Sequence, residues 1–152
     1  MNQNRFEQGR VFEQRVGAVW RRRGFFTFDA SAYGTSGSFM GEGGASIFLP
    51  DFLVCHPVER SCYWLEVKSQ SGTFMRCGEP TLGVKRAAFH GYQRVQEITG
   101  IQVQMAICDA GDDVFYCGSV DQWAQRAIAT QRKDWIDFSL RGVWCMRLPE
   151  AP

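Results

Sequence analysis

Three ionisable residues, Asp51, Glu66 and Lys68, border two short apolar segments of the chain. Asp51 precedes the run 52–55, and Glu66 and Lys68 follow the run 62–65. Charged residues are uncommon in strands, and a buried charge needs a partner or a metal ion. Two carboxylates suit a hard divalent cation, and an ammonium group beside them suits chemistry on a phosphate ester.

The element that must position these residues is a β-hairpin. The segment between the two runs, 56–61, is polar and contains a proline, which predicts a turn between two antiparallel strands. A turn centred on this segment places Asp51 opposite Glu66. Period-two alternation then places Lys68 on the same face, one step beyond Glu66. The hairpin therefore predicts that all three side chains converge at one end.

A metal site follows from this convergence. Asp51, Glu66 and the carbonyl of Val67 are the expected ligands of Mg²⁺ or Mn²⁺, with water completing the coordination. Lys68 would orient or help to deprotonate the attacking water, or stabilise negative charge on the phosphate under attack. The alternative is a surface hairpin whose Glu66 and Lys68 are ordinary exposed charges.

The letters Pro50-Asp51 and Glu66-Val67-Lys68 resemble the motif of the PD-(D/E)XK nuclease superfamily. The context strengthens the match, because the first pair opens one predicted strand and the second group closes the next. The resemblance implies an α/β fold with a restriction-endonuclease-like core in the order αβββαβ, in which helices flank a mixed central β-sheet. It also implies Mg²⁺-dependent hydrolysis of DNA.

An amphipathic helix is predicted over about 4–23, with a stripe of Phe12, Val16, Val19 and Trp20 and with a glycine after it. The segment RVFEQRVGAVWRRRGF is similar to the opening helix of archaeal-type Holliday junction resolvases. The resemblance implies that Glu13 is the acidic residue that this helix adds to the metal site. Glu7 is the alternative, and a solvated carboxylate is the plain interpretation of Glu13.

Two further segments supply candidate DNA contacts. The segment 30–46 is rich in glycine and serine and too long for a simple turn, which is typical of a functional loop. Ser36 or Ser38 matches, through the resemblance, a DNA-binding serine of resolvase-like nucleases. A second helix, predicted over 84–99, carries Arg86 and Arg94 on its polar face, which is either solvated or faces a phosphate backbone.

The rest of the chain is expected to serve the architecture. Strands are predicted at 25–28, 103–108 and 114–117, a polar loop at 69–83, a short helix from Ser119 or Asp121 to about Thr130, and a final hairpin around Arg141-Gly142. We expect a single domain over 1–152, with its core at about 4–109 and a C-terminal helix and hairpin at 110–152.

Composition bounds the protein class. The 152 residues include 45% hydrophobic and 22% charged residues, and no apolar run approaches the roughly 20 residues of a membrane span. A polar N-terminus without a signal peptide predicts a cytoplasmic protein, in which the six cysteines are mostly reduced core residues. A disulfide between Cys55 and Cys62, which face each other across the hairpin, is the alternative.

The predicted metal site, together with the resemblance, favours a Mg²⁺-dependent deoxyribonuclease, and the resemblance implies branched recombination or repair intermediates as candidate substrates. The net charge of +1 is low for a DNA-binding protein and leaves open a non-cleaving module that binds nucleic acid or a protein partner. An RNA-specific nuclease is a third interpretation, without an aromatic RNA-binding motif to support it. Junction resolution would require a homodimer that presents two sites.

Overall fold

The computed structural model describes residues 3–30, 38–40, 46–130 and 132–150, which form three helices and twelve strands. Their order is α1 (Gln3–Arg22), β1 (Phe26–Asp29), β2 (Ser38–Met40), β3 (Ser46–Phe48), β4 (Phe52–His56), β5 (Ser61–Gln70), β6 (Phe74–Arg76), β7 (Glu79–Lys85), α2 (Arg86–Thr99), β8 (Val103–Asp109), β9 (Val114–Ser119), α3 (Val120–Gln125), β10 (Ala127–Ile128), β11 (Trp135–Ser139) and β12 (Cys145–Arg147). The predicted core order is confirmed in α1, β1, β4, β5, α2 and β8. The pairs β2–β3 and β6–β7 are inserted into it.

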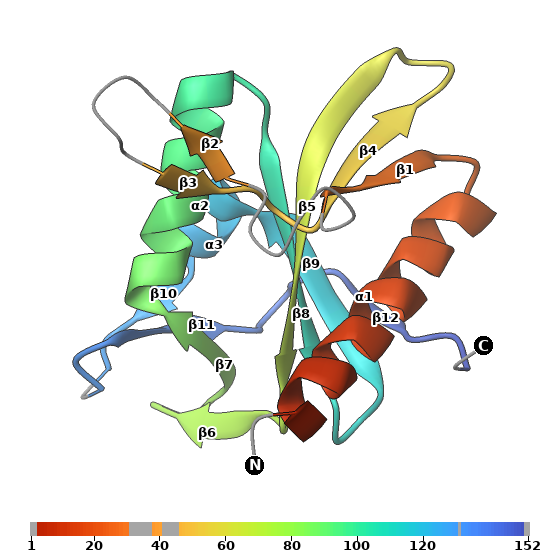
Figure 1. Ribbon diagram of the computed structural model, residues 1–152. Helices are drawn as coiled ribbons and strands as arrows, with labels where there is room; N and C mark the ends of the chain where they lie inside the picture. The colour runs from red at the N-terminus through yellow and green to blue at the C-terminus, as the bar shows by residue number, and fades with distance from the viewer. Residues whose placement is uncertain (1–2, 31–37, 41–45, 131, 151–152) are drawn as a thin grey trace.

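A mixed six-stranded sheet with the order β1-β4-β5-β8-β9-β12 forms the centre of the fold. Its one parallel pair is β5 and β8, which are joined through α2 as a parallel pair requires. Figure 1 shows α1 on one side of the central strands and α2 on the other. The predicted fold class, a mixed sheet flanked by helices, is confirmed. None of the helices in the described residues is long and apolar enough to cross a membrane.

Helix α1 packs on the sheet through the stripe predicted from the sequence. Phe12, Val16, Val19 and Trp20 are buried against residues of β4, β5, β8 and β9, and this burial is the main force that holds an amphipathic helix in place. The chain leaves the helix through Gly24, whose φ of 86° is one that glycine adopts without strain.

Arg15 ties helix α1 to the far end of the chain. Its side chain is buried, and its two terminal nitrogens lie 2.6 and 2.7 Å from the carboxylate oxygens of Asp113. Its Nε donates a third hydrogen bond, of 2.6 Å, to the carbonyl of Pro149. Such a bidentate arrangement fixes orientation as well as distance.

The β4–β5 hairpin has the predicted register. Cys55 pairs with Cys62 and Phe52 pairs with Leu65, which is the alignment that places Asp51 opposite Glu66. Cys55 and Cys62 form a disulfide, with 4.2 Å between their Cα atoms. The expectation that the cysteines are mostly reduced core residues was wrong, because two are paired and two others, Cys77 and Cys145, are exposed.

The disulfide predicts how many free thiols the protein has. Of the six cysteines in the sequence, four are free, so thiol titration of the denatured, unreduced protein should find about four thiols. Titration after reduction should find about two more. Six thiols in both samples, from protein purified without reductant, would show that Cys55 and Cys62 remain reduced.

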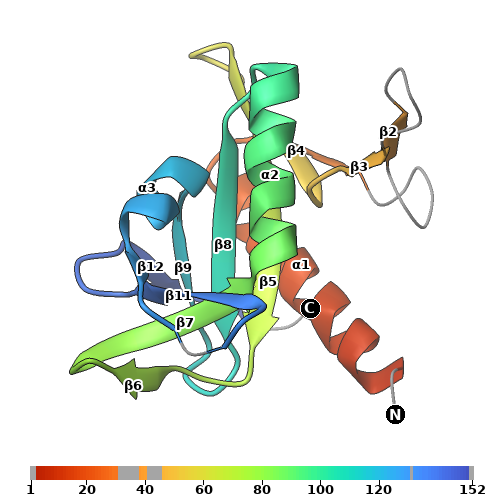
Figure 2. The same cartoon turned by 90° about the vertical axis from the view of Figure 1, so that its left-hand side faces the viewer.

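A second sheet with the order β10-β11-β7-β6 packs on the α2 side of the molecule, where Leu82, Val84, Ile136 and Phe138 join the core beneath α2. Figure 2 shows its strands near the N-terminal end of α2.

Two expectations for the C-terminal half of the chain were wrong. The predicted loop 69–83 is largely strand, and the predicted C-terminal hairpin does not form, because β11 pairs with β7 whereas β12 pairs with β9. Helix α3 is capped by Ser119 but ends at Gln125, before Thr130.

A buried ion cluster, Arg76–Asp137–Arg132, lies in this second sheet. Asp137 is fully buried, and its carboxylate pairs with the side chain of Arg132 and with Arg76, whose Nε lies 2.9 Å away. The Arg132 guanidinium also lies over Trp135, 4.5 Å from the ring centroid. Asp137 pairs across the strands with Gly83, where a Cβ atom would overlap both Asp137 and Arg132. Any larger residue at position 83 would therefore have to displace the Asp137 and Arg132 side chains.

Candidate active site

The two strands of the hairpin differ in length, and the candidate site lies where they part. Strand β4 has five residues and β5 has ten, so their pairing ends at Phe52 and Leu65. Strand β5 continues beside β8 as far as Gln70. Past the end of β4, the backbone N–H of Val67 donates to Oδ2 of Asp51 over 2.7 Å. Asp51 thus satisfies a strand donor with its side chain.

Glu66 and Lys68 project from β5 toward Tyr92 of helix α2. Glu66 is 4% exposed, and its Oε1 accepts a 2.6 Å hydrogen bond from the Tyr92 hydroxyl. The same oxygen forms an ion pair with the Lys68 ammonium group, which lies 5.4 Å from the centroid of the Tyr92 ring. Burial by itself lowers the pKa of Lys68, but the Glu66 carboxylate and Tyr92 outweigh it and raise that pKa. Lys68 is therefore held in its charged form.

Two further carboxyl groups, those of Asp51 and Glu13, lie near this ion pair. The pKa of Asp51 is raised to about 8. Burial is the largest cause and the Glu66 and Glu13 carboxylates add to it, whereas the Val67 N–H and Lys68 oppose the rise. The pKa of Glu13 is also raised, mainly by burial and then by the negative charges of Glu66 and Asp29. The positive charges of Lys68 and Arg10 lower it by less. Carboxylates that destabilise one another in this way create a site that favours a bound cation.

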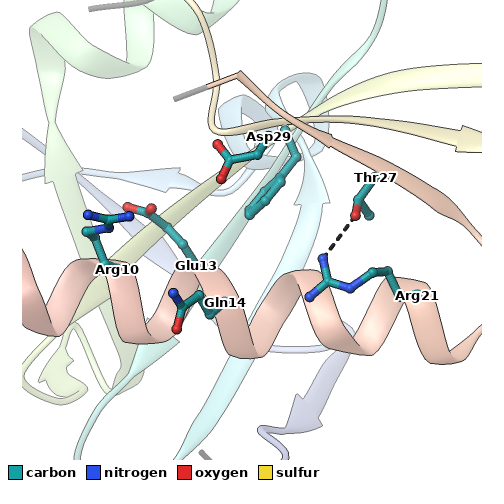
Figure 3. A pocket seen from close by; sticks show the side chains of 7 residues that line it. Arg10, Glu13, Gln14, Arg21, Thr27 and Asp29 are labelled. Atoms are coloured by element: carbon teal, nitrogen blue, oxygen red, sulfur yellow. Dashed lines mark hydrogen bonds between the residues drawn. The ribbon is translucent and has the colours of Figure 1, made fainter. Parts of the chain in front are cut away.

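A pocket of about 170 Å³ opens between α1 and β1, next to these carboxylates. Figure 3 shows Glu13 and Asp29 directed into it, with the Arg10 guanidinium beside Glu13. At the other end Arg21 donates a 3.0 Å hydrogen bond to the hydroxyl of Thr27. The pocket thus places acidic groups in its interior and two arginines along its helical wall.

The structure brings Glu13, rather than Glu7, toward the carboxylates. Glu13 is half-buried, and its pKa is raised by burial and then by the Glu66 carboxylate, whereas Glu7 is exposed. Six residues separate the two along α1, which corresponds to about 9 Å along the helix axis.

The candidate DNA contacts lie away from this cluster or outside the described residues. Ser36 lies outside the described residues, and Ser38 lies in β2, where only the backbone is described. Arg86 and Arg94 are exposed on α2. The Arg86 guanidinium donates a 3.1 Å hydrogen bond to the carbonyl of Trp135, so it also serves the contact between α2 and β11.

Tyr92 and Asp29 belong to the site and were missed in the sequence. Tyr92 lies in the apolar stripe of its helix, so the sequence pattern marks it as a core residue. Its hydroxyl is the one hint of a polar contact, because a buried tyrosine needs a hydrogen-bond partner. Asp29 is the last residue of β1 and pairs with Phe52, next to Asp51. A single sequence has no residue spacing that would connect a carboxylate at the end of a short strand, such as Asp29, with a distant site.

Across the described part of the chain, no group of three or more His, Cys, Asp or Glu side chains is arranged to hold a metal ion. The donor set that remains is smaller: the carboxylates of Asp51 and Glu66 and the backbone of β5. Two carboxylates with one carbonyl suit Mg²⁺, which retains several water ligands in proteins.

The raised pKa of Asp51 predicts a pH-dependent stability. The ordinary pKa is 3.8 and the folded-state value is about 8, so the folded protein retains a proton that the unfolded chain has released. The stabilisation that results is complete below the ordinary pKa and is lost as the pH rises through about 8. In a chelating buffer, Asp51→Asn should melt several degrees above wild type near pH 8, and the difference should shrink toward pH 5. Parallel melting profiles would contradict this origin of the pKa shift.

Comparison with known proteins supports the fold. No protein-family model and no curated protein sequence matches the chain. Among solved structures, the chain is similar to Hjc, a Holliday junction resolvase from the archaeal hyperthermophile Archaeoglobus fulgidus, with a TM-score of 0.55. The match covers 88% of this chain and 85% of that one at 14% sequence identity. At this identity the likeness shows a shared fold.

Proposed function

We propose that the protein is a Mg²⁺-dependent deoxyribonuclease that hydrolyses phosphodiester bonds of branched DNA in recombination or repair. The observation that carries the proposal is the convergence of Asp51, Glu66 and Lys68 at the point where β4 and β5 part. The same fold occurs in a Holliday junction resolvase, which supports both the reaction and the class of substrate.

Asp51, Glu66 and the carbonyl of Val67 are the proposed ligands of Mg²⁺ or Mn²⁺. The Val67 N–H points to the edge of β5 at which Asp51 lies, and in a strand the carbonyl of a residue faces the same edge as its N–H. The mutual repulsion of Asp51, Glu66 and Glu13 fits a bound cation. The chemistry that the ion supplies at such a site is activation of the attacking water and stabilisation of charge on the phosphate.

Lys68 and Glu13 have different proposed roles. Because Glu66 and Tyr92 hold Lys68 as an ammonium group, Lys68 stabilises negative charge on the phosphate and orients the water rather than removing its proton. Glu13 reaches the site from α1 and helps to place the metal or its water. Tyr92 is a positioning residue, since it holds the Glu66 oxygen that Lys68 also contacts.

DNA is the proposed partner. Arg86 and Arg94 would contact phosphates from the exposed face of α2. Ser36 or Ser38 would contact DNA from the glycine- and serine-rich segment 30–46. Resolution of a junction requires two cuts, so we propose a homodimer for that activity. We further propose that the protein acts in the cytoplasm as a single domain.

The near-neutral net charge of +1 favours a second candidate, a module of this fold that binds nucleic acid or a protein without cutting. The two candidates differ in their response to salt and to metal. A binding affinity that falls steeply with salt indicates phosphate contacts, whereas a flat response indicates a protein partner.

The decisive experiment is isothermal titration of Mg²⁺ or Mn²⁺ into wild type and Asp51→Ala, paired with incubation on linear, circular, single-stranded and branched DNA. We expect metal binding and metal-dependent cleavage by wild type and the loss of both in Asp51→Ala. Asp112→Ala is the matched control, because Asp112 is exposed in the turn between β8 and β9. Cleavage that survives in Asp51→Ala would place the chemistry elsewhere.

A further inference from the structure

A second hollow, which we call the aromatic groove, lies at the C-terminal end of α1. Its volume is about 370 Å³, and Trp20, Tyr63 and Trp144 form its aromatic walls. The Trp20 indole N–H donates to the Tyr63 hydroxyl, which fixes these two rings relative to each other. Trp144 is 44% exposed, so much of its surface is available to a ligand. The exposed ring of Trp144 beside these two fixed rings suits a flat, apolar-faced ligand.

The polar groups of the aromatic groove select for an electron-rich or anionic ligand. Arg23 lines the groove, with its guanidinium 5.2 Å from the centroid of the Trp144 ring, and no acidic side chain is among its described lining residues. Gln104 and Gln122 add amide groups. The thiol of Cys117 is also part of the lining, and burial raises its pKa to about 12, so it remains neutral.

Another hollow shares lining residues with the aromatic groove and contains a second arginine. This smaller hollow, of about 190 Å³, shares Cys117, Gln122 and Trp144 with the groove and reaches Arg126. The position of Arg126 is fixed by a 2.5 Å hydrogen bond from its Nη1 to the carbonyl of Arg141. Again no carboxylate lies in the described lining. The exposed Trp144 ring thus lines two hollows that share several residues, one of them with Arg23 and the other with Arg126.

A nucleic-acid strand carries this pattern of groups, because each base lies between two phosphates. Aromatic rings stack on bases, amide side chains form hydrogen bonds with base edges, and arginines pair with phosphates. In a duplex the faces of a base are covered by its stacked neighbours, so the ligand must be unpaired. We propose that the aromatic groove binds an unpaired base of a single-stranded nucleic acid, with Arg23 and Arg126 contacting the flanking phosphates.

This site is separate from the carboxylate site. Trp20 and Glu13 are seven residues apart on α1, which corresponds to about 10 Å along the helix axis. Binding in the groove needs neither a metal ion nor Asp51. It goes beyond the proposed nuclease function, to which it would add a preference for DNA with a single-stranded branch.

The test is fluorescence anisotropy of a labelled oligothymidine in a chelating buffer, where metal-dependent cleavage cannot interfere. Trp144→Ala should raise the Kd about 5- to 100-fold, and Trp144→Phe should restore much of the affinity if it melts at the wild-type temperature. Arg23→Gln should weaken binding and reduce its dependence on salt. Arg60→Gln, in the exposed turn of the hairpin, is the matched control and should bind like wild type.

Two ligands complete the test. An abasic strand of the same length keeps the phosphates and removes the bases, so it should bind several-fold more weakly than oligothymidine and should not distinguish Trp144→Ala from wild type. Equal binding of the two strands, or full competition by an acidic peptide, would overturn the proposal in favour of a general anion or protein site. Loss of cleavage in Asp51→Ala bears only on the nuclease function, so the two proposals fail separately.

Discussion

Glu66→Gln is expected to reduce metal-dependent DNA cleavage about 10³-fold or more, equivalent to about 4 kcal/mol of transition-state stabilisation. The substitution keeps the shape of the side chain and removes a proposed metal ligand. It also removes the charge that pairs with Lys68, although the Tyr92 hydroxyl can still donate to the amide oxygen. The measurement is the single-turnover cleavage rate at saturating Mg²⁺, on the DNA that wild type cuts best.

Glu7→Gln is the matched control, because it makes the same chemical change at an exposed position of α1. It should cleave like wild type. Lys68→Ala should separate the two functions of the site, with metal binding retained and cleavage lost. Wild-type rates for both Glu66→Gln and Lys68→Ala, in folded protein, would contradict the proposed assignment of these residues.

Removal of both arginines of the buried ion cluster, as Arg76→Ala with Arg132→Ala, should destabilise the protein by about 3–5 kcal/mol. Asp137 is fully buried, so the double variant leaves a carboxylate in the protein interior without its two cations. A loss of this size is a large fraction of the stability of an ordinary domain. The free energy of unfolding from urea titration, monitored by tryptophan fluorescence, measures it.

Arg141→Ala is the control within the same region. Arg141 lies 3.9 Å from Glu79, and its side chain is 77% exposed, so its removal should cost less than about 1 kcal/mol. If the double variant lost no more stability than Arg141→Ala, the Asp137 carboxylate would have to be hydrated or protonated in the folded protein.

The hairpin and its site could be predicted because their determinants are local. Two apolar runs and a polar turn were enough to give the pairing of Cys55 with Cys62, and with it the approach of Asp51 to Glu66. The approach of Glu13 to these carboxylates was predicted in another way, through the resemblance to a known helix, because no spacing rule connects a helix residue to a distant strand. The order of the core elements followed in the same way.

The second sheet could not be predicted, for two physical reasons. All residues from Thr81 to Val84 are buried, so β7 lacks the alternation that identifies a half-exposed strand. Its partner β11 lies about fifty positions later in the chain, and pairing over that distance leaves no local signal. In the sequence Asp137 looks like any other charged residue. Its two arginine partners are brought to it only by the folded structure.

The hydrogen bond from Arg15 to Pro149 attaches helix α1, which carries Glu13, to the C-terminal segment. Arg15 is two residues from Glu13, and its partner Pro149 is 134 positions away along the chain. Deleting the segment from Leu148 onward would remove this contact and a buried leucine from the α1 side of the core. An affinity tag should therefore not replace the residues from Leu148 onward.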